Sequence, residues 1–302
     1  MSEIDKIINN LKAFDLSLTS DEVIINELRK IGNFASNVLT IQVGQFVIRS
    51  RCEEIFTPFF FEKDISYIND KTFIPQYNRG SLEGESMFYG CMPTNFTDDE
   101  TNCQMLSIAE VTKIIGRETQ EIIEEYTTMG KWRVIKDFKA LAIAHHQDFM
   151  SKNPELLNIH NGFLDYVKQF PEKEKDFIAL AEFMSYEFAK IVTDEKRFEY
   201  KISGAFTKNI LNSKLLQGIL YPSAKHGKEI TGFNIVMPPS TVDNNLKLEK
   251  VMVWRNRQKG KKGANIPYLY CDTFSPNGKF IWKEPENYVN SAFYMNSRLL
   301  SE

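Results

Sequence analysis

Residues 218–239 read GILYPSAKHGKEITGFNIVMPP. Together with the residues before it, the run LLQGILYPS predicts a strand that ends at the Pro222-Ser223 turn, because proline and serine favour turns. After a link that contains glycine, GFNIVMPP predicts a second strand that stops at two prolines. Polar residues at a strand-to-loop junction often face a binding site, so Ser223 is a candidate functional residue.

The segments on both sides of this strand pair indicate the fold class. Upstream, strands are predicted at 39–51, 87–92 and 130–143, and helices at 106–115, 172–192 and 202–213. Downstream, strands are predicted at 247–256 and 267–274, with a Pro-Asn-Gly turn at 276–278 before another short run. Strands and helices do not alternate regularly, so the sequence predicts an α+β fold with a mixed sheet and not a doubly wound one.

Residues 1–40 are expected to form a helical cap on the main domain. Ile4, Ile7, Ile8 and Leu11 share one helical face, and a second apolar stripe follows the capping-box spacing of a Thr and a Glu. These helices could also serve as a contact surface. The rest of the chain, 41–302, is predicted to be one domain with a core at about 44–240 and a C-terminal β extension.

Composition and charge narrow the class of protein. The 302 residues are 42% hydrophobic, 13% aromatic and 25% charged, which is typical of a globular chain with material for a core and an apolar pocket. The net charge of −3 argues against a broad nucleic-acid surface. Four cysteines without CxxC spacing indicate free thiols in a reducing compartment. No signal peptide or membrane span is recognisable, so a cytoplasmic protein that does not enter membranes is expected.

Arginines and an aromatic residue near the first strands are candidates for ligand binding. Arg49 and Arg51 lie two apart on a strand, hence on one face, and arginine binds phosphate through two parallel hydrogen bonds. The glycine-containing loop in YNRGSLEGESMFYG, residues 77–90, carries Arg79 and leads into a strand with Tyr89, which could stack on a flat ring. The alternatives are surface arginines, an ordinary loop and a core tyrosine.

An acidic residue in an apolar helical segment is the third candidate. Glu110 shares a helical face with Leu106, Ser107 and Ile114. A carboxylate there needs a cation, a hydrogen-bond network or a ligand, so a structural salt bridge and a catalytic role are both open.

Several common signatures are absent from the sequence. It contains no GxxxxGK[ST], GxGxxG, GxSxG or HExxH motif, which argues against the usual nucleotide-binding, hydrolase and metalloprotease classes. His145 and His146 are adjacent and cannot share a helical face, and His160 and His226 are isolated in the sequence. No metal site is therefore expected on the histidines.

Taken together, these segments resemble the RES-domain family, named for its Arg, Glu and Ser. The family has an Arg at the end of an early strand, a Gly-containing Arg–Asn loop, a strand ending in Tyr, a Glu inside a helix, and a late Tyr-Pro-Ser strand before a Gly-Asn-hydrophobic strand. The residues that match are Arg49 (with Arg51 as the nearby alternative), Arg79, Tyr89, Glu110, Tyr221 and Ser223. The resemblance spans about residues 44–240. Residues 92–104 look inserted, and the loop arginine lacks an Asn directly after it.

The resemblance implies a fold like that of ADP-ribosyltransferases and an enzyme that consumes NAD. Such proteins split the nicotinamide–ribose bond with water or inorganic phosphate as acceptor, need no metal, and are often toxins blocked by an antitoxin protein. NAD would be a substrate, and no cofactor is implied. Glu110 would stabilise the positive charge that develops on the ribose. An arginine (Arg49, with Arg51 or Arg79) would hold the pyrophosphate or an acceptor phosphate, and Tyr89 would stack on or bracket the nicotinamide. Ser223 would hydrogen-bond the carboxamide, the ribose or the acceptor, and Tyr221 is a further binding residue.

Two other functions remain open from the sequence. The same pocket could transfer ADP-ribose to a protein side chain. Alternatively, the chain could be a non-enzymatic module that binds nucleic acid through a basic run, which consists of Arg255, Arg257, Lys259, Lys261 and Lys262. With the overall charge negative, we expect this run to be a solvated loop between two strands and nucleic acid not to be a partner.

Overall fold

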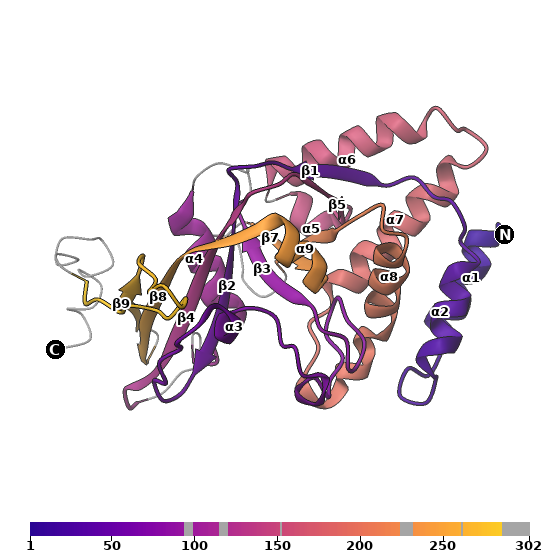
Figure 1. Cartoon of the computed structure of the whole chain (residues 1–302). Helices are drawn as coiled ribbons and strands as arrows, with labels where there is room; N and C mark the ends of the chain where they lie inside the picture. Colours follow the sequence, from indigo (N-terminus) through magenta and orange to yellow (C-terminus); the bar gives the residue numbers. More distant parts are fainter. Residues whose placement is uncertain (94–98, 115–119, 152, 224–231, 261, 286–302) are drawn as a thin grey trace.

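The computed structural model describes residues 1–93, 99–114, 120–151, 153–223, 232–260 and 262–285 (Figure 1). Within them, nine strands form one open sheet in the order β1-β5-β6-β7-β3-β2-β4-β8-β9. Only β5 and β6 pair in parallel. The strands are β1 (Asn37–Ile41), β2 (Phe46–Glu53), β3 (Phe88–Met92), β4 (Ile123–Val134), β5 (Phe138–Ala142), β6 (Gly218–Pro222), β7 (Phe233–Met237), β8 (Leu246–Lys259) and β9 (Lys262–Cys271).

Helices cover both faces of this sheet. They are α1 (Glu3–Ala13), α2 (Asp21–Arg29), α3 (Glu62–Ile65), α4 (Glu100–Val111), α5 (Gln147–Met150), α6 (Pro154–Val167), α7 (Glu174–Ala189), α8 (Lys201–Asn212) and α9 (Pro239–Asn245), with 3-10 turns η1 (Lys71–Phe73) and η2 (Asp194–Tyr200). The predicted α+β class with a mixed sheet is therefore confirmed. In the described part of the chain, none of the helices has the length and apolarity that a membrane crossing requires.

Three apolar clusters show how the layers pack. One joins α1, α2, α7 and α8 to the face of β5, β6 and β7 that carries Leu141, Ile219 and Val236. A second joins α4 to β2, β4 and β8 on the same face, through Ile48, Met129 and their neighbours. The third fills the opposite face, where Trp132 is fully buried. Helix α4 and the α7–α8 pair thus cover different parts of the same face.

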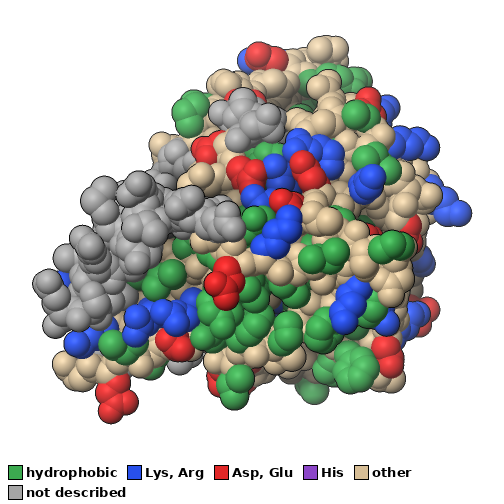
Figure 2. All heavy atoms as spheres, turned by 60° about the vertical axis from the view of Figure 1, so that its left-hand side comes forward, with side chains coloured by type: hydrophobic (Ala, Val, Ile, Leu, Met, Phe, Trp, Pro, Cys, Tyr) green, Lys and Arg blue, Asp and Glu red, His purple; other side chains and the backbone are tan. Residues whose placement is uncertain are grey.

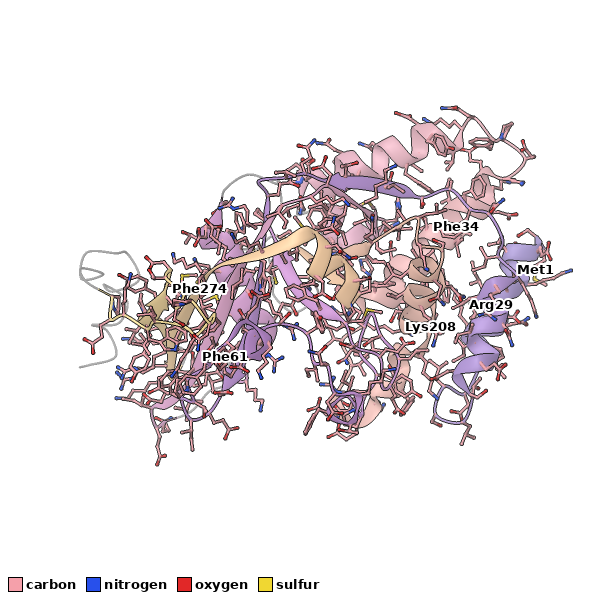
Figure 3. All side chains as sticks on the ribbon, viewed as in Figure 1. Met1, Arg29, Phe34, Phe61, Lys208 and Phe274 are labelled. Carbon is pink, nitrogen blue, oxygen red and sulfur yellow. The ribbon has the colours of Figure 1, made fainter. Side chains whose placement is uncertain are left out.

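The two ends of the molecule differ in character. Figure 1 shows the N-terminal helices α1 and α2 at one end and the β8–β9 hairpin at the other. In Figure 3, Arg29 and Phe34 lie at the helical end, and Phe61 and Phe274 lie at the hairpin end. Helices are thus present within 1–40 as predicted, and strands follow the core as predicted.

Two predicted strands are each divided in the structure. The run 39–51 forms β1 and β2, because the chain turns at Gly44, whose φ of +92° favours glycine. The run 130–143 likewise forms β4 and β5, and Asn245 binds the carbonyls of Lys136 and Asp137 in the turn between them. Both predictions of a single strand were wrong, because contacts between residues far apart in the sequence stabilise these turns, such as the hydrogen bond from the Val43 amide to Asp137.

Other boundaries also differ from the prediction. Helix α4 begins at Glu100, where Asp99 accepts a hydrogen bond from the Asn102 amide, and it ends at Val111 and not at 115. Helices α6 and α9 were missed, although each has a proline in its first turn. The basic run is not a loop: Arg255, Arg257 and Lys259 belong to β8, and β9 starts at Lys262. Lys261 lies outside the described residues.

Candidate functional site

A cavity of about 400 Å³ is lined by residues of α4, of the strands β2, β3, β6 and β7, of the turn that carries Arg79, and of η2, which joins α7 to α8. Five of the seven predicted site residues line it, namely Arg49, Arg79, Tyr89, Glu110 and Tyr221. Ser223 reaches the same site through its hydrogen bond to Glu110, and Arg51 is not among the lining residues. On the face shown in Figure 2, basic and acidic side chains gather near the centre, and hydrophobic side chains spread below them.

Two neutral donors on adjacent strands hold the Glu110 carboxylate. Ser223 Oγ donates to Glu110 Oε1 at 2.5 Å, and Asn234 Nδ2 donates to the same oxygen at 2.8 Å. Ser223 follows the last residue of β6, and Asn234 is paired with Tyr221 in the register of β6 and β7. The sheet therefore fixes both donors, and α4 brings the carboxylate to them.

The orientation of the Asn234 amide is itself fixed. Cys91 Sγ, on the neighbouring strand β3, donates to Asn234 Oδ1 at 3.3 Å. Because the thiol occupies the amide oxygen, the amide nitrogen faces Glu110. Cys91 is buried, and burial raises its pKa well above the usual value, so it stays a thiol.

Arg79 projects from a tight turn into the cavity. Asn78 and Ser81 exchange backbone hydrogen bonds of 3.0 and 3.1 Å around it. The turn is packed closely on β7, since a Cβ on Gly80 would lie 2.7 Å from a methyl group of Val236. Arg79 Nη2 donates to the Lys190 carbonyl at 2.8 Å, and its Nε is buried without a hydrogen-bond partner among the described residues.

Aromatic rings enclose the Arg79 guanidinium. The rings of Tyr200 and Tyr221 each lie 5.6 Å from it. Burial alone would lower the pKa of Arg79, but the oxygens of Tyr221, Tyr200 and Glu110 raise it overall. The cavity thus contains a guanidinium group that stays positively charged and that lies beside two aromatic rings. Tyr89 is half-buried and donates a hydrogen bond to Ser81 Oγ at 2.8 Å. Burial raises the pKa of both Tyr89 and Tyr221, so both side chains are neutral phenols.

Arg49 borders the cavity from the other side of the sheet. Its side chain leaves β2 away from α4 and donates through Nε to the carbonyls of Ile65 and Ser66, both at 3.1 Å. Nη1 donates to the Tyr89 carbonyl at 2.9 Å, where β2 and β3 pair only at Ile48 and Cys91. Burial and the nearby Arg51 lower the pKa of Arg49 to about 9, which still leaves it charged at neutral pH. Arg49 therefore binds backbone as well as bordering the cavity.

Arg51 shares the face of Arg49, as its spacing predicted, but it lies away from the cavity. Its Nη2 donates to the Ser66 carbonyl at 2.8 Å. Successive side chains of a strand point to opposite faces of the sheet, so two arginines two residues apart lie on the same side of β2. Only Arg49, which lies nearer the point where β2 and β3 separate, borders the site.

Several lining residues were missed from the sequence. Asn234 stands in GFNIVMPP, which was predicted only as a strand, so its polar side chain among apolar neighbours was the available signal. Asp194, Arg197 and Tyr200 come from η2, and Asn78 comes from the loop before Arg79. The segment 194–200 has no apolar periodicity, so nothing in the sequence marked it.

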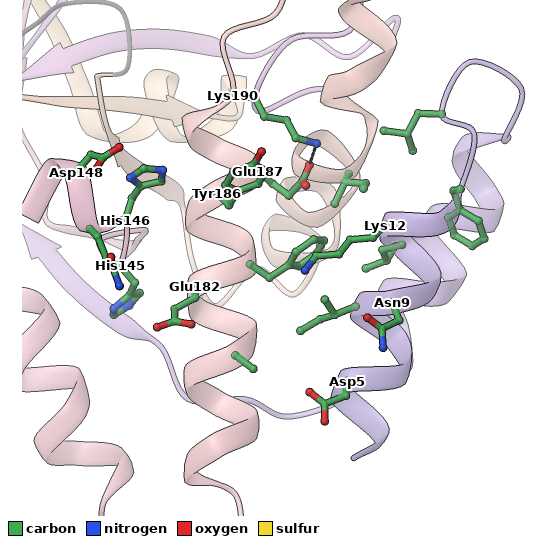
Figure 4. A pocket seen from close by; sticks show the side chains of 18 residues that line it. Asp5, Asn9, Lys12, His145, His146, Asp148, Glu182, Tyr186, Glu187 and Lys190 are labelled. Carbon is green, nitrogen blue, oxygen red and sulfur yellow. Dashed lines mark hydrogen bonds and ion pairs between the residues drawn. The ribbon is translucent and has the colours of Figure 1, made fainter. Parts of the chain in front are cut away.

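A second and larger cavity, of about 1030 Å³, lies between α1 and α7 (Figure 4). Its lining includes His145, His146, Glu182 and Glu187, and none of the predicted site residues. His145 Nδ1 lies 2.9 Å from His160 Nδ1, so these two histidines are not isolated in space. Among the described residues, no three His, Cys, Asp or Glu side chains form a group that could hold a metal ion, and His226 lies outside those residues.

Two comparisons of the sequence with known proteins find no match. A scan against protein-family models finds no model that matches the chain. A search of curated proteins finds no significant match. The RES-domain resemblance therefore stays a prediction based on the residues quoted above.

Proposed function

We propose that this chain cleaves the bond between nicotinamide and ribose in NAD, with water or inorganic phosphate as the acceptor. The observation that carries the proposal is the convergence of a held carboxylate, a cationic arginine and tyrosine rings in one cavity of about 400 Å³. This volume is within the range of small-molecule sites. A dinucleotide with a cationic base, ribose hydroxyls and phosphates presents groups that complement these side chains.

In the proposed reaction, the C–N bond breaks and nicotinamide leaves as a neutral base with the bonding electron pair. The ribose then carries positive charge, which a nearby carboxylate stabilises. Glu110 suits this role because Ser223 and Asn234 already fix its position, so little reorganisation is needed in the transition state. Water or phosphate forms the new bond at the ribose, and when water is the acceptor a proton is released.

The remaining lining residues have supporting roles in this proposal. Arg79 binds the phosphate next to the nicotinamide ribose, since its charge is maintained and its Nε lacks a protein partner in the described part of the chain. Tyr89 and Tyr221 contact the nicotinamide. Arg49 contributes positive potential and fixes the backbone of β3 through the Tyr89 carbonyl.

The test is NAD turnover by the wild type and by Glu110→Gln, with and without phosphate, followed by chromatography and mass spectrometry of the products. We expect the wild type to release nicotinamide and Glu110→Gln to lose about 10²–10³ in rate, because a positioned charge is removed. Glu54→Gln is the control: this carboxylate is 82% exposed, and it lies 3.9 Å from the Lys113 ammonium.

Two results would contradict the proposal, namely no nicotinamide release by the wild type or near-normal release by Glu110→Gln. ADP-ribose found on a protein, instead of free or joined to phosphate, would identify the chain as a transferase. An antitoxin protein, if one exists, would act by covering this cavity.

A further inference from the structure

Arg197 borders the same cavity but has no role in the bond-breaking step described above. Its Nε and Nη2 both donate to Asp194 Oδ1, at 2.9 and 2.6 Å, and Nη1 donates to Asn78 Oδ1 at 3.0 Å. These contacts come from its own element η2 and from the turn that carries Arg79. They fix the guanidinium plane at the side of the cavity.

Arg79 and Arg197 lie at different depths. Arg79 is enclosed by Tyr200 and Tyr221, and Glu110 is close enough to influence its pKa. Arg197 keeps 32% of its side chain exposed, and its partner Asp194 keeps 78% exposed. One guanidinium is thus near the reacting carboxylate, and the other is at the rim.

The charge of the lining favours an anion that spans both positions. Among the described residues, three lining side chains are guanidinium groups and two are carboxylates. An exposed ion pair such as Asp194–Arg197 contributes little stability, so a phosphate can replace or share Asp194 at small cost. Arginine presents two parallel N–H groups to such an oxyanion.

We propose that Arg197 forms a subsite for the nucleoside monophosphate half of the dinucleotide that does not carry nicotinamide, and that it binds the phosphate of that half. The proposal rests on the proposed function for the identity of the substrate. Arg79 and Arg197 then bind the two phosphates of one pyrophosphate. Because of this subsite, the cavity binds a dinucleotide more tightly than a mononucleotide that carries the same nicotinamide–ribose bond.

The experiment compares the wild type, Arg197→Gln and Lys196→Gln. Lys196 is the matched control, because it is an exposed cation on the same element that does not line the cavity. Initial rates are measured with NAD and with nicotinamide mononucleotide, and ADP binding is measured by calorimetry.

For Arg197→Gln we expect the KM for NAD to rise about tenfold, which is about 1.4 kcal/mol, and kcat to stay the same, because the lost hydrogen bonds to the phosphate contribute to binding alone. We also expect ADP to bind about tenfold more weakly and the kinetics with the mononucleotide to be unchanged. Lys196→Gln should match the wild type in every measurement.

The subsite is wrong if Arg197→Gln leaves the KM for NAD and the ADP affinity unchanged, or if it affects NAD and the mononucleotide equally. NAD cleavage without dependence on Arg197 would reject the subsite and keep the proposed function. ADP binding that depends on Arg197, in a protein that cleaves neither compound, would reject the proposed function and keep the subsite.

Discussion

The Glu110 carboxylate is held by a hydroxyl and an amide, neither of which carries charge. A bidentate arginine in their place would neutralise the carboxylate and weaken its effect on a developing cation. These two donors hold the position of the carboxylate, and neither of them adds a charge. Asn234 is therefore as important to the proposed chemistry as Ser223, although only Ser223 was singled out from the sequence.

Replacement of Asn234 by aspartate tests this view of the carboxylate. Asn234→Asp places a second carboxylate at the position whose amide now lies 2.8 Å from Glu110. Two carboxylates that share a site resist ionising together, so the acidic limb of the pH profile of NAD turnover should move to higher pH by about one unit or more. The measurement is initial rate against pH. An acidic limb that stays in place would contradict the proposed effect of the side chain at position 234 on Glu110.

Arg49→Lys separates the charge of Arg49 from its hydrogen bonds. Lysine keeps the charge but has no group at the position of Nε, which now reaches the carbonyls of Ile65 and Ser66. Urea unfolding should show a loss of about 1–3 kcal/mol. Arg51→Lys is the comparison, since Arg51 makes one such bond, and it should lose less. Equal losses would contradict this account of Arg49.

How far the sequence predicts the site depends on the kind of information each residue needs. Residue type and local context were enough to select Glu110, Arg79 and Tyr221, which do line one cavity. The spacing of two placed Arg49 and Arg51 on one face correctly. It could not show which of them borders the site, because that depends on where β2 separates from β3, a long-range feature.

At the scale of elements, α4 is held on the sheet by a charge pair as well as by apolar contacts. Lys131 Nζ, on β4, lies 2.5 Å from Glu100 Oε2 in the first turn of α4. The Lys131 ammonium also lies 4.9 Å from the Phe46 ring. This pair fixes the start of the helix that carries Glu110 near its end.

The variant Glu100→Gln should show how much this ion pair contributes to the stability of the fold and how that contribution depends on pH. Burial alone raises the pKa of Glu100, but the hydrogen bond and charge of Lys131 lower it below its usual 4.5. A carboxyl group whose pKa is lower in the folded than in the unfolded state stabilises the folded protein at pH values above its unfolded-state pKa. This stabilisation is lost as the pH falls through the folded-state pKa. The variant should be less stable by about 1–2 kcal/mol at pH 7, with a gap that narrows below pH ~4.5.

Urea midpoints between pH 7 and pH 3 provide the measurement. Glu54→Gln should follow the wild type across this range, because its carboxylate is exposed. A gap between Glu100→Gln and the wild type that stays constant with pH would contradict the assigned pair.

Helices and strands were predicted well where apolar residues recur at one regular spacing along the whole element. The helices α7 and α8 and the strands β6 and β7 match their predicted runs closely. The turns after β1 and β4 and the 3-10 turn η2 were missed, because each is stabilised by contacts with distant residues, such as Val43 with Asp137 and Arg197 with Asn78. Such contacts have no local pattern.

At the scale of the whole molecule, α1 and α2 complete the helical layer. Ile24 is fully buried in the cluster that joins them to α7 and α8. Tyr77 donates to Asp21 at 3.1 Å, and Lys201 donates to the Thr19 carbonyl at 2.8 Å. The first helices thus contact the loop that leads into Arg79.

Ile24→Ala should lower the free energy of unfolding by about 2–5 kcal/mol, because it leaves a cavity in this cluster. Val23→Ala is the neighbouring control: Val23 is 47% exposed, and its truncation should change stability little. Thermal and urea unfolding give the measurement. Equal stability of the two variants would contradict the packing of α2 on α8.

The order of the strands in the sheet has a consequence for how the protein is made. Ser223 and Asn234 are more than a hundred residues beyond Glu110 in the chain, yet they hold its carboxylate. During synthesis on the ribosome, Glu110 is therefore made first, and Ser223 and Asn234 are made much later. If NAD is the substrate, the growing polypeptide would spare the cell's nicotinamide dinucleotide until residues 223 and 234 have been made.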